Sequence, residues 1–152
     1  MEIRLFRETE QEKIKNFICW IVEKEILSVN NQIHCDLDDL KKIYRQPRCA
    51  LLVAEENSQL IGTVAVKEES EDTALIRRLF VHPAYRRRGY GFVLLHRAID
   101  FCHLNNYKKA VFHASTDMSH AISLCLKYGF REDGQFENIE NLKIASLYYE
   151  VT

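Results

Sequence analysis

The stretch from Leu79 to Gly91 most constrains what this chain can fold into. An apolar run ends at Pro83, a basic segment with two glycines follows, and an apolar segment with helical spacing begins at Phe92. A loop that leads into a helix in this way brings together backbone N–H groups, the positive end of the helix dipole and arginine side chains. This combination predicts a binding site for a phosphate group.

The positive charge around this loop is local. The chain of 152 residues carries 21 Lys and Arg against 22 Asp and Glu, yet it has no acidic residue between Ala74 and Ile99. A cation cluster in a nearly neutral chain indicates a local anion, so nucleic acid is not an expected partner. The alternative is a solvated basic turn, against which the glycines argue because they let a ligand approach the backbone. The arginines of this window are Arg77, Arg78, Arg86, Arg87, Arg88 and Arg97.

Three motifs resemble those of one enzyme family. The segment from Arg86 to Gly91, of the form Arg-x-x-Gly-x-Gly, resembles the acetyl-CoA signature of the GCN5-related N-acetyltransferases, the GNAT superfamily. Leu79 to Pro83 stands where these enzymes have their central strand. Ala121 to Phe130 is similar to the family's second motif, an Ala-x-x-Leu-Tyr helix that ends in Gly-Phe. The matched motifs lie between residues 74 and 130, and the flanks fit the family in length and pattern.

The patterning along the chain predicts a compatible fold. Alternating or β-rich runs predict strands, and apolar residues at helical spacing predict four helices, in the order β-α-α-β-β-β-α-β-α-β-β. The fold class is therefore α+β, a central mixed, mostly antiparallel twisted sheet with helices on both faces, and residues 1–152 form a single domain. Capping by Thr9 with Glu12 is expected to start the first helix, and Pro47 to end the second.

The resemblance implies where acetyl-CoA would bind. The loop and the first helical residues would hold its pyrophosphate, and its pantetheine arm would pair with the backbone of the central strand. A backbone N–H near Phe80 or Val81 would then face the thioester oxygen as an oxyanion donor. The predicted cofactor-binding residues are Leu79, Phe80, Val81, Arg86, Arg87, Arg88, Gly89, Tyr90 and Gly91.

The chain departs from the family at two positions of the second motif. Many members have a tyrosine four residues before the Gly of Gly-Phe, where it protonates the departing thiolate, but this chain has Cys125. Cys125 is the candidate catalytic residue because a thiol is acidic enough to replace the phenol; the alternative is a small buried cysteine on an apolar helix face. Many members also have an asparagine three residues before the helix alanine, where this chain has Met118.

The general base and the acceptor site remain open in the sequence. Glu68, Glu69, His113 and His120 stand near predicted strand ends or a helix start, and water-relayed proton loss without a dedicated base is a further possibility. In the family, the first two helices form one wall of the acceptor site. Asp36 and its neighbours Asp38 and Asp39 would make that wall acidic and suited to a cationic amine, or they would only complement a helix N-terminus. Trp20 either packs or lines the acceptor pocket.

The cysteines and the N-terminus bear on the compartment. Five cysteines, Cys19, Cys35, Cys49, Cys102 and Cys125, are widely spaced without a Cys-x-x-Cys pair. Neither a disulfide framework nor a metal site is therefore predicted, and buried reduced thiols in a cytoplasmic protein are expected. No apolar run is long enough to span a bilayer, and the N-terminus lacks the form of a signal peptide.

The resemblance predicts an enzyme that transfers the acetyl group of acetyl-CoA, as co-substrate, to a primary amine. The acceptor would be a small molecule or an amino acid, with a protein amine as a second choice, and the enzyme would be a monomer or a homodimer. The alternative is a catalytically silent acyl-CoA-binding module with a sensing or regulatory role, which the missing tyrosine and asparagine favour.

Overall fold

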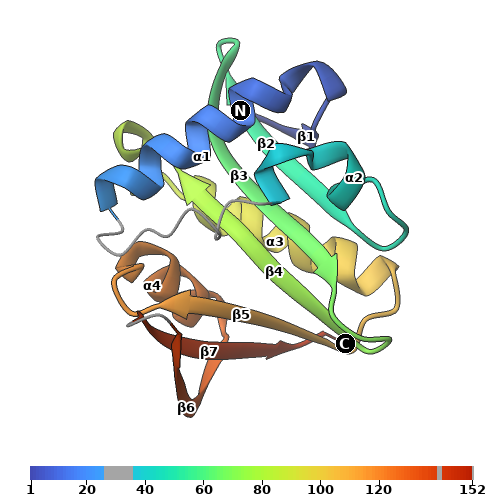
Figure 1. Ribbon diagram of the computed structural model, residues 1–152, viewed down its shortest axis with the longest axis vertical. Coiled ribbons are helices and arrows are strands. Elements are labelled where there is room, and N and C mark those ends of the chain that lie inside the picture. The colour runs from blue at the N-terminus through green and yellow to red at the C-terminus, as the bar shows by residue number, and fades with distance from the viewer. Residues whose placement is uncertain (26–35, 140–141, 152) are drawn as a thin grey trace.

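The computed structural model describes residues 1–25, 36–139 and 142–151 (Figure 1). Within these residues, one seven-stranded sheet carries four α-helices, and the elements follow one another in the predicted order. The strands are β1 (Glu2–Leu5), β2 (Ala50–Glu56), β3 (Gln59–Glu68), β4 (Thr73–Val81), β5 (Lys109–Ser115), β6 (Arg131–Ile139) and β7 (Leu142–Glu150). The helices are α1 (Gln11–Glu25), α2 (Leu40–Tyr44), α3 (Tyr90–Leu104) and α4 (Ser119–Tyr128).

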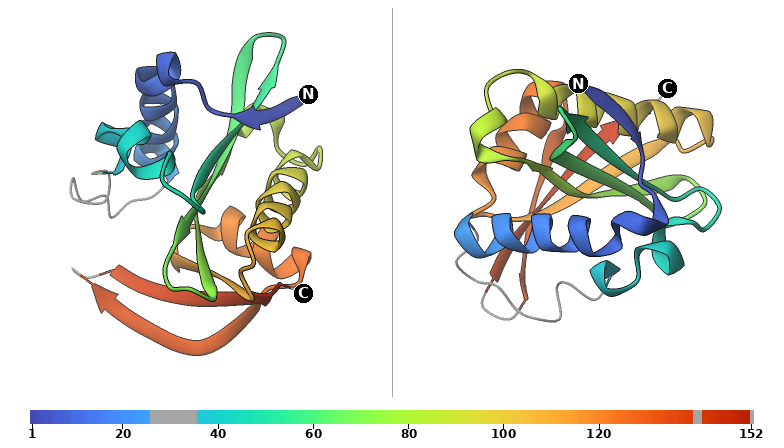
Figure 2. Two further views of the ribbon diagram at one scale, coloured as in Figure 1. Left: turned by 90° about the vertical axis from the view of Figure 1, so that its right-hand side faces the viewer. Right: turned by 90° about the horizontal axis from the view of Figure 1, so that it is seen from above.

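The sheet is mixed and mostly antiparallel, as predicted. Its strand order is β1-β2-β3-β4-β5-β7-β6, and among these neighbours only β4 and β5 run parallel. Two adjacent parallel strands need a crossover connection, which α3 provides. Helices α1 and α2 cover one face of the sheet, and α3 and α4 cover the other (Figure 2).

Each face of the sheet has its own apolar cluster. Under α1, Ile14, Ile18 and Ile21 stand at the helical spacing that predicts this helix, and all three are fully buried or nearly so. On α3 the predicted stripe is partly wrong. Phe92 is 40% exposed, and the buried face of the helix consists of Gly91, Leu94, Leu95, Ala98, Ile99 and Cys102. Phe92 lies at the edge of this face, and the helix begins two residues earlier than expected.

The central strands separate halfway along the sheet. Strand β4 pairs with β5 from Thr73 opposite Lys109 as far as Ile76 opposite Phe112, and beyond this point the two strands diverge (Figure 1). Directly after the last pair, the register between β3 and β4 shifts and Arg78 adopts a left-handed conformation with φ of 55°. Such a bulge bends the strand, so β4 leaves its neighbour and exposes one backbone edge.

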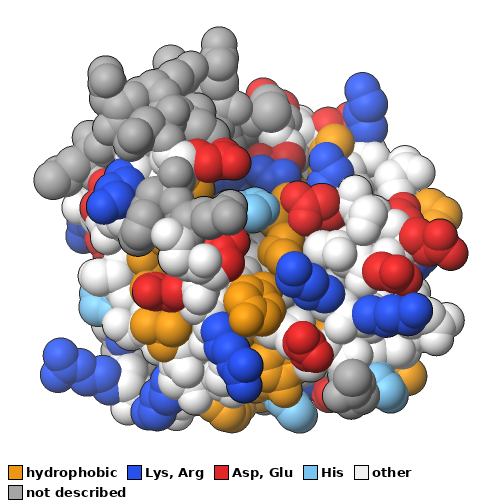
Figure 3. Space-filling view, turned by 90° about the horizontal axis from the view of Figure 1, so that it is seen from below, with side chains coloured by type: hydrophobic (Ala, Val, Ile, Leu, Met, Phe, Trp, Pro, Cys, Tyr) orange, Lys and Arg blue, Asp and Glu red, His pale blue; other side chains and the backbone are white. Residues whose placement is uncertain are grey.

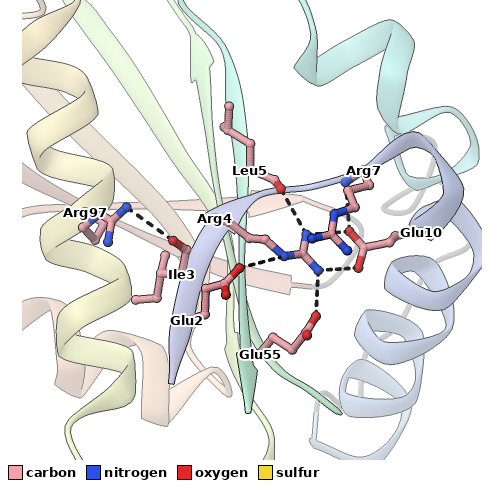
Figure 4. Close-up of polar contacts among 8 residues, drawn as sticks. All are labelled: Glu2, Ile3, Arg4, Leu5, Arg7, Glu10, Glu55 and Arg97. Atoms are coloured by element: carbon pink, nitrogen blue, oxygen red, sulfur yellow. Dashed lines mark hydrogen bonds and ion pairs between the residues drawn. The ribbon is translucent and has the colours of Figure 1, made fainter. Parts of the chain in front are cut away.

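The N-terminal strand is held by an arginine fork. The guanidinium of Arg4 donates hydrogen bonds of 2.8 Å to both carboxylate oxygens of Glu10 and one of 2.7 Å to Glu55 (Figure 4). The hydrogen bond from Arg4 lowers the pKa of Glu10 to about 2, even though burial acts in the opposite direction. Glu10 also accepts the backbone N–H of Arg7 at 2.8 Å. A 3-10 turn therefore precedes α1, and the predicted cap at Thr9 is wrong.

The remaining turns and helix starts are fixed by residues close in sequence. The hairpin between β2 and β3 turns at Asn57 and Ser58, both at positive φ. The second helix is shorter than expected, and Asp39 caps it by accepting the N–H of Lys42 at 3.2 Å. The loop predicted over 28–35 lies outside the described residues. In the described part of the chain, no helix has the length and hydropathy needed to cross a membrane.

Four of the five cysteines lie in the described residues. All four are free thiols; Cys102 and Cys125 are buried, while Cys19 and Cys49 are half-buried. Cys35 lies outside the described residues. The expected burial therefore holds for Cys102 and Cys125 and only in part for Cys19 and Cys49.

Candidate functional site

A cleft of about 1060 Å³ lies between the diverging end of β4 and the N-terminal turns of α3 and α4. The C-terminal end of α1 also contributes Ile21 and Glu25 to its wall. All the residues predicted from the sequence to bind the cofactor line this one cleft: Leu79, Phe80, Val81, Arg86, Arg87, Arg88, Gly89, Tyr90 and Gly91. Folding therefore brings the strand, the loop and the helix start to a single concave surface.

The loop between β4 and α3 has an unusual backbone. Arg87 adopts φ of 64° and Gly89 adopts φ of 82°, both in the left-handed region. Left-handed residues beside right-handed ones turn successive N–H groups toward one side and form a concave anion site. At Arg87 this conformation costs a non-glycine residue about 1–2 kcal/mol. Strain of this kind is typical of a segment that binds a ligand.

Helix α3 begins without a cap that would occupy its N–H groups. Gly89 is the N-cap residue and has no side chain, and the first helical hydrogen bond is donated by Val93 to the carbonyl of Gly89 at 3.1 Å. The N–H groups of Tyr90, Gly91 and Phe92 precede it and have no acceptor within the helix. The first turn also contains no acidic residue. This helix end is therefore suited to an anion.

The two glycines of the loop do different things. A Cβ at Gly89 would meet no atom within 4 Å, so Gly89 provides the positive φ and leaves the space in front of the helix open. A Cβ at Gly91 would lie 2.7 Å from Leu124 and 3.2 Å from Val81. Gly91 is therefore favoured by the close packing of α3 against α4 and β4, and it also lines the cleft, where its ligand role stays a prediction.

The three arginines of the loop also differ. The guanidinium of Arg86 donates to the carbonyl of Val81 at 3.1 Å and pairs with Glu25 of α1 at 2.7 Å. Arg86 thus ties the loop to the end of β4 and to α1. Arg87 and Arg88 are exposed, and Arg88 lies over the ring of Tyr85.

Some cleft residues were missed in the sequence. Lys127 lines the cleft from α4 and adds a cation to it. A lysine in the last turn of a helix is common because it complements the dipole, so nothing in the sequence set Lys127 apart. Glu25 was missed for a similar reason, because its partner Arg86 lies far away in the sequence.

The exposed edge of β4 presents particular amide groups to the cleft. His82 donates its N–H to the carbonyl of Ile61 in β3 at 2.8 Å. Because successive amides of a strand point to opposite edges, the N–H of Phe80 also faces β3, while those of Leu79 and Val81 face the gap left by β5. Of the two candidate oxyanion donors, geometry thus favours Val81 over Phe80.

Cys125 lies away from the cleft. Its side chain is fully buried in the core between the sheet and the helices, and it is absent from the residues that line the cleft. Burial also raises the pKa of its thiol to about 12. Both observations favour the packing role that the sequence left open. Tyr128 is no substitute, because its hydroxyl contacts the imidazole of His96 on α3 at 2.8 Å.

The predicted acidic wall of the acceptor site does not form. Asp36 is buried in contact with Arg78, Asp38 pairs with Lys15 at 2.7 Å, and Asp39 is occupied as a helix cap. Asp36 and Asp38 are therefore neutralised by ion pairs, and the carboxylate of Asp39 is engaged by the backbone of α2. On the underside of the molecule, the described acidic and basic side chains also lie next to each other, with apolar ones between them (Figure 3).

Trp20 is a packing residue at the end of β4. Its ring lies 5.0 Å from that of His82, and it is absent from the residues that line the cleft. His82 in turn accepts the N–H of Ala84 on Nδ1. Burial, followed by the charges of Arg86 and Lys24, lowers the pKa of His82, so its imidazole is neutral.

Two of the candidate bases come together beside the split. His113 Nδ1 lies 2.8 Å from the hydroxyl of Ser146 on β7, and its Nε2 lies 3.6 Å from Glu69. His113 directly follows Phe112, the last residue of β5 that pairs with β4. Glu68 instead pairs with Arg48 at 2.6 Å, while His120 lines the cleft at the start of α4.

Comparison with known proteins identifies the family. The model of the acetyltransferase (GNAT) family matches residues 14–130. The chain belongs to the GNAT family of acetyltransferases. The match covers the α1 wall, the central strand, the loop and the second motif, so the resemblance stated from the motifs is confirmed.

The curated relatives include N-acetylaspartate synthetases and N-acetyltransferases by name. An N-acetylaspartate synthetase from Danio rerio is 32% identical over 118 residues, which are 76% of this chain and 42% of the relative. An N-acetyltransferase 8B from Rattus norvegicus is 30% identical over 114 residues, 71% of this chain and 51% of the relative. The chain thus spans about half the length of the curated relatives it matches, or less.

Solved structures share the whole fold. A GNAT-family acetyltransferase from Staphylococcus aureus Mu50 superposes with a TM-score of 0.88 at 19% identity, covering 99% of both chains. A putative acetyltransferase from Salmonella typhimurium, solved with its cofactor acetyl-CoA, has a TM-score of 0.83 at 20% identity and covers 99% of this chain and 94% of its own. At these identities the agreement establishes the fold.

Proposed function

We propose that this protein is an N-acetyltransferase that moves the acetyl group of acetyl-CoA to a primary amine of a small molecule or an amino acid. A protein amine is the second choice of acceptor. The observation that carries the proposal is the cleft itself. It joins a helix N-terminus with three available N–H groups to the exposed edge of a central strand, and the predicted residues line it.

The cleft residues fit acetyl-CoA in both charge and shape. The loop amides and the start of α3 would hold the pyrophosphate, with Arg87, Arg88 and Lys127 supplying positive charge. The pantetheine arm carries amide groups, and the free edge of β4 offers matching donors and acceptors in the manner of an added strand. Acetyl-CoA supplies an activated acyl group as the co-substrate.

The chain would assist the transfer by position and by hydrogen bonds. The N–H of Val81 points into the gap between β4 and β5, where it would stabilise negative charge on the carbonyl oxygen that the amine attacks. The amine adds to the carbonyl carbon, the carbon–sulfur bond breaks, and the coenzyme leaves as a thiolate. Holding both substrates in one cleft makes the reaction effectively unimolecular, which can supply much of the rate.

The proton lost by the amine would pass to a base that reaches the cleft or to water. Of the candidate bases, His120 lines the cleft at the start of α4. His113 contacts Ser146 at 2.8 Å and Glu69 at 3.6 Å, but it is absent from the residues that line the cleft.

A catalytically silent acyl-CoA-binding module is the second candidate. Two observations favour it: Cys125 is buried where many members have a catalytic tyrosine, and Met118 replaces the asparagine near the cofactor. Such a module would keep the loop and the helix start while lacking turnover. The cytoplasmic location, like the monomeric or dimeric state, stays a prediction of the sequence.

Two measurements separate these functions. Acetyl-CoA is expected to raise the melting temperature, because a ligand that binds only the native state stabilises it by mass action. Release of free coenzyme A is then followed over a panel of amines. Turnover with any acceptor supports the enzyme, whereas a thermal shift without turnover across the panel supports the module. The absence of a shift at millimolar acetyl-CoA would reject both.

A further inference from the structure

The bulge in β4 turns two consecutive arginines to the same side of the sheet. Across the bulge, the partner of Thr63 is Phe80 while that of Ala65 is Arg77, so β4 contains one residue more than β3. The hydroxyl of Thr63 donates to the carbonyl of Arg78 at 2.7 Å and holds the bulge in place. In a regular strand neighbouring side chains point to opposite faces, but here both Arg77 and Arg78 reach Asp36 on the α2 side.

Asp36 is already fully engaged by one of these arginines and a tyrosine. Arg78 donates to its Oδ1 at 2.5 Å and to its Oδ2 at 3.1 Å, and the hydroxyl of Tyr44 donates to Oδ2 at 2.5 Å. Burial acts to raise the pKa of Asp36, but the hydrogen bonds and charge of Arg78 outweigh it and hold the pKa below its ordinary value. The carboxylate of Asp36 is thus the nearest counter-charge of both Arg78 and Arg77.

Arg77 is left with an incomplete set of partners. Its Nη2 lies 3.5 Å from Asp36 Oδ1, which is beyond a good hydrogen bond, and it makes no hydrogen bond with any residue in the described ranges. Its side chain is 29% exposed, against 5% for that of Arg78. A guanidinium has five N–H donors in a planar fork that matches a carboxylate, so this group is suited to a second anion from outside.

Arg77 stands where β4 leaves β5, next to the strand segment that lines the cleft, although its own side chain is absent from that lining. It directly follows Ile76, the last residue of β4 that pairs with β5, so it stands where the strands begin to separate. Leu79, which lines the cleft, comes two residues later. On the neighbouring strand, His113 occupies the equivalent place just beyond the last pair. An acceptor amine that approaches the split from the α2 side would therefore pass Arg77.

We propose that Arg77 binds a carboxylate of the acceptor, so that the acceptor is an amine carrying an acid group, as in an amino acid. The proposal rests on the proposed acetyltransferase function and narrows its substrate class. It replaces the expectation of an acidic wall for a cationic amine, because Asp36 and Asp38 are paired, Asp39 caps α2, and Arg77 lies beyond hydrogen-bond distance of its one counter-charge. A polyamine, with positive charge alone, would be repelled here.

The test compares acceptors that differ only in the acid group. Rates are measured for a set of L-amino acids and for their carboxamides, in which a neutral amide replaces the α-carboxylate. The wild type is expected to prefer the acid by roughly tenfold to a hundredfold in kcat/KM, the range for a charge-assisted hydrogen-bonded pair. Arg77→Gln is expected to remove this preference while keeping the rate with the carboxamide, and Arg77→Lys to keep part of it.

The matched control is Arg97→Gln, which removes a guanidinium that lies on α3 and contacts only the carbonyl of Ile3, at 3.4 Å, among the described residues. It should leave the preference unchanged. A wild type that favours the carboxamide, or treats both alike, would overturn the proposal. So would an equal loss of both activities in Arg77→Gln with the folded fraction verified by melting.

A binding measurement keeps this inference distinct from the proposed function. If no acceptor is turned over, thermal shifts are measured in the presence of coenzyme A with N-acetyl amino acids and with their carboxamides. A larger shift with the acids that is lost in Arg77→Gln would support the carboxylate site although the proposed catalysis failed. Equal shifts with acids and carboxamides would reject the carboxylate site.

Discussion

Two arginine-rich segments of the same chain region have opposite surroundings. The pair Arg77 and Arg78 lies in the bulge of β4 and faces a buried carboxylate, whereas the run from Arg86 to Arg88 lies in a loop around a cleft. In the sequence both look alike, since neither has an acidic neighbour. In the structure, the ion pair of Arg78 with Asp36 is buried and stabilises the fold, while Arg77 beside it is partly exposed. In the loop, Arg86 is tied to Glu25, and Arg87 and Arg88 are exposed. The difference shows that the role of a charge cluster can be inferred only once its partners in the folded structure are known.

The largest expected effect is on the bulge. Asp36→Asn should lower the free energy of unfolding by about 3–5 kcal/mol, because it leaves the guanidinium of Arg78 buried without its counter-charge. Chemical denaturation of the variant measures this. Asp38→Asn is the matched control, since Asp38 is exposed and pairs only with Lys15 among the described residues, and it should cost less than about 1 kcal/mol. Similar losses of unfolding free energy in Asp36→Asn and Asp38→Asn would contradict a special structural role for the buried pair of Asp36 with Arg78.

A second large effect is expected in the loop, and on ligand binding. Gly89→Val should weaken acetyl-CoA more than tenfold, because a branched side chain would enter the space in front of α3, and should also cost about 1–2 kcal/mol of stability through its positive φ. Titration by thermal shift measures the affinity. Gly134→Val is the matched control, because Gly134 also has positive φ, 77°, and open space around its Cβ position, but lies on β6. Equal weakening by both would contradict a role for the loop in binding.

A smaller effect is expected at Arg86. Arg86→Ala should weaken acetyl-CoA by roughly three- to tenfold, and more than Arg97→Ala, because it removes a charge at the loop and its ties to Val81 and Glu25. Glu25→Gln sharpens the comparison. If Arg86 acts by holding the loop to α1, breaking its ion pair with Glu25 should weaken the binding of acetyl-CoA. If Arg86 contacts the phosphate directly, its release from Glu25 should leave the affinity for acetyl-CoA unchanged or raise it. Affinities by calorimetry distinguish the two outcomes.

The smallest effect on activity is expected at Cys125. Cys125→Ser should leave turnover per folded molecule within about twofold and lower stability by about 1–3 kcal/mol, because a hydroxyl replaces a buried thiol in an apolar site. Cys125→Tyr should destabilise by overpacking. Steady-state rates are divided by the folded fraction from circular dichroism. A loss of about a hundredfold in folded Cys125→Ser would instead restore this thiol as the general acid.

Local patterns were sufficient for the order of elements and for the loop. The helix stripe of Ile14 and Ile18, the hairpin turn at Asn57 and Ser58, and the Gly-containing start of α3 all depend on interactions among residues close in sequence. Helix spacing, turn conformation and helix capping are local properties, so a sequence can be expected to reveal them. The motif from Arg86 to Gly91 belongs to this class, which is why its residues were found to share one cleft.

Only the tertiary structure determined which partners the charged and buried groups have. The residues around Asp36 in the sequence do not indicate that it forms a buried ion pair with Arg78, far along the chain. The sequence also does not indicate that His113, Ser146 and Glu69 come into contact from different parts of the sheet. The burial of Cys125 and the packing need for Gly91 likewise depend on how α3 and α4 meet β4. Local propensity determined the elements and the phosphate loop of this protein, whereas long-range contacts chose among equally plausible roles for each side chain, because electrostatic and packing energies depend on distance in space.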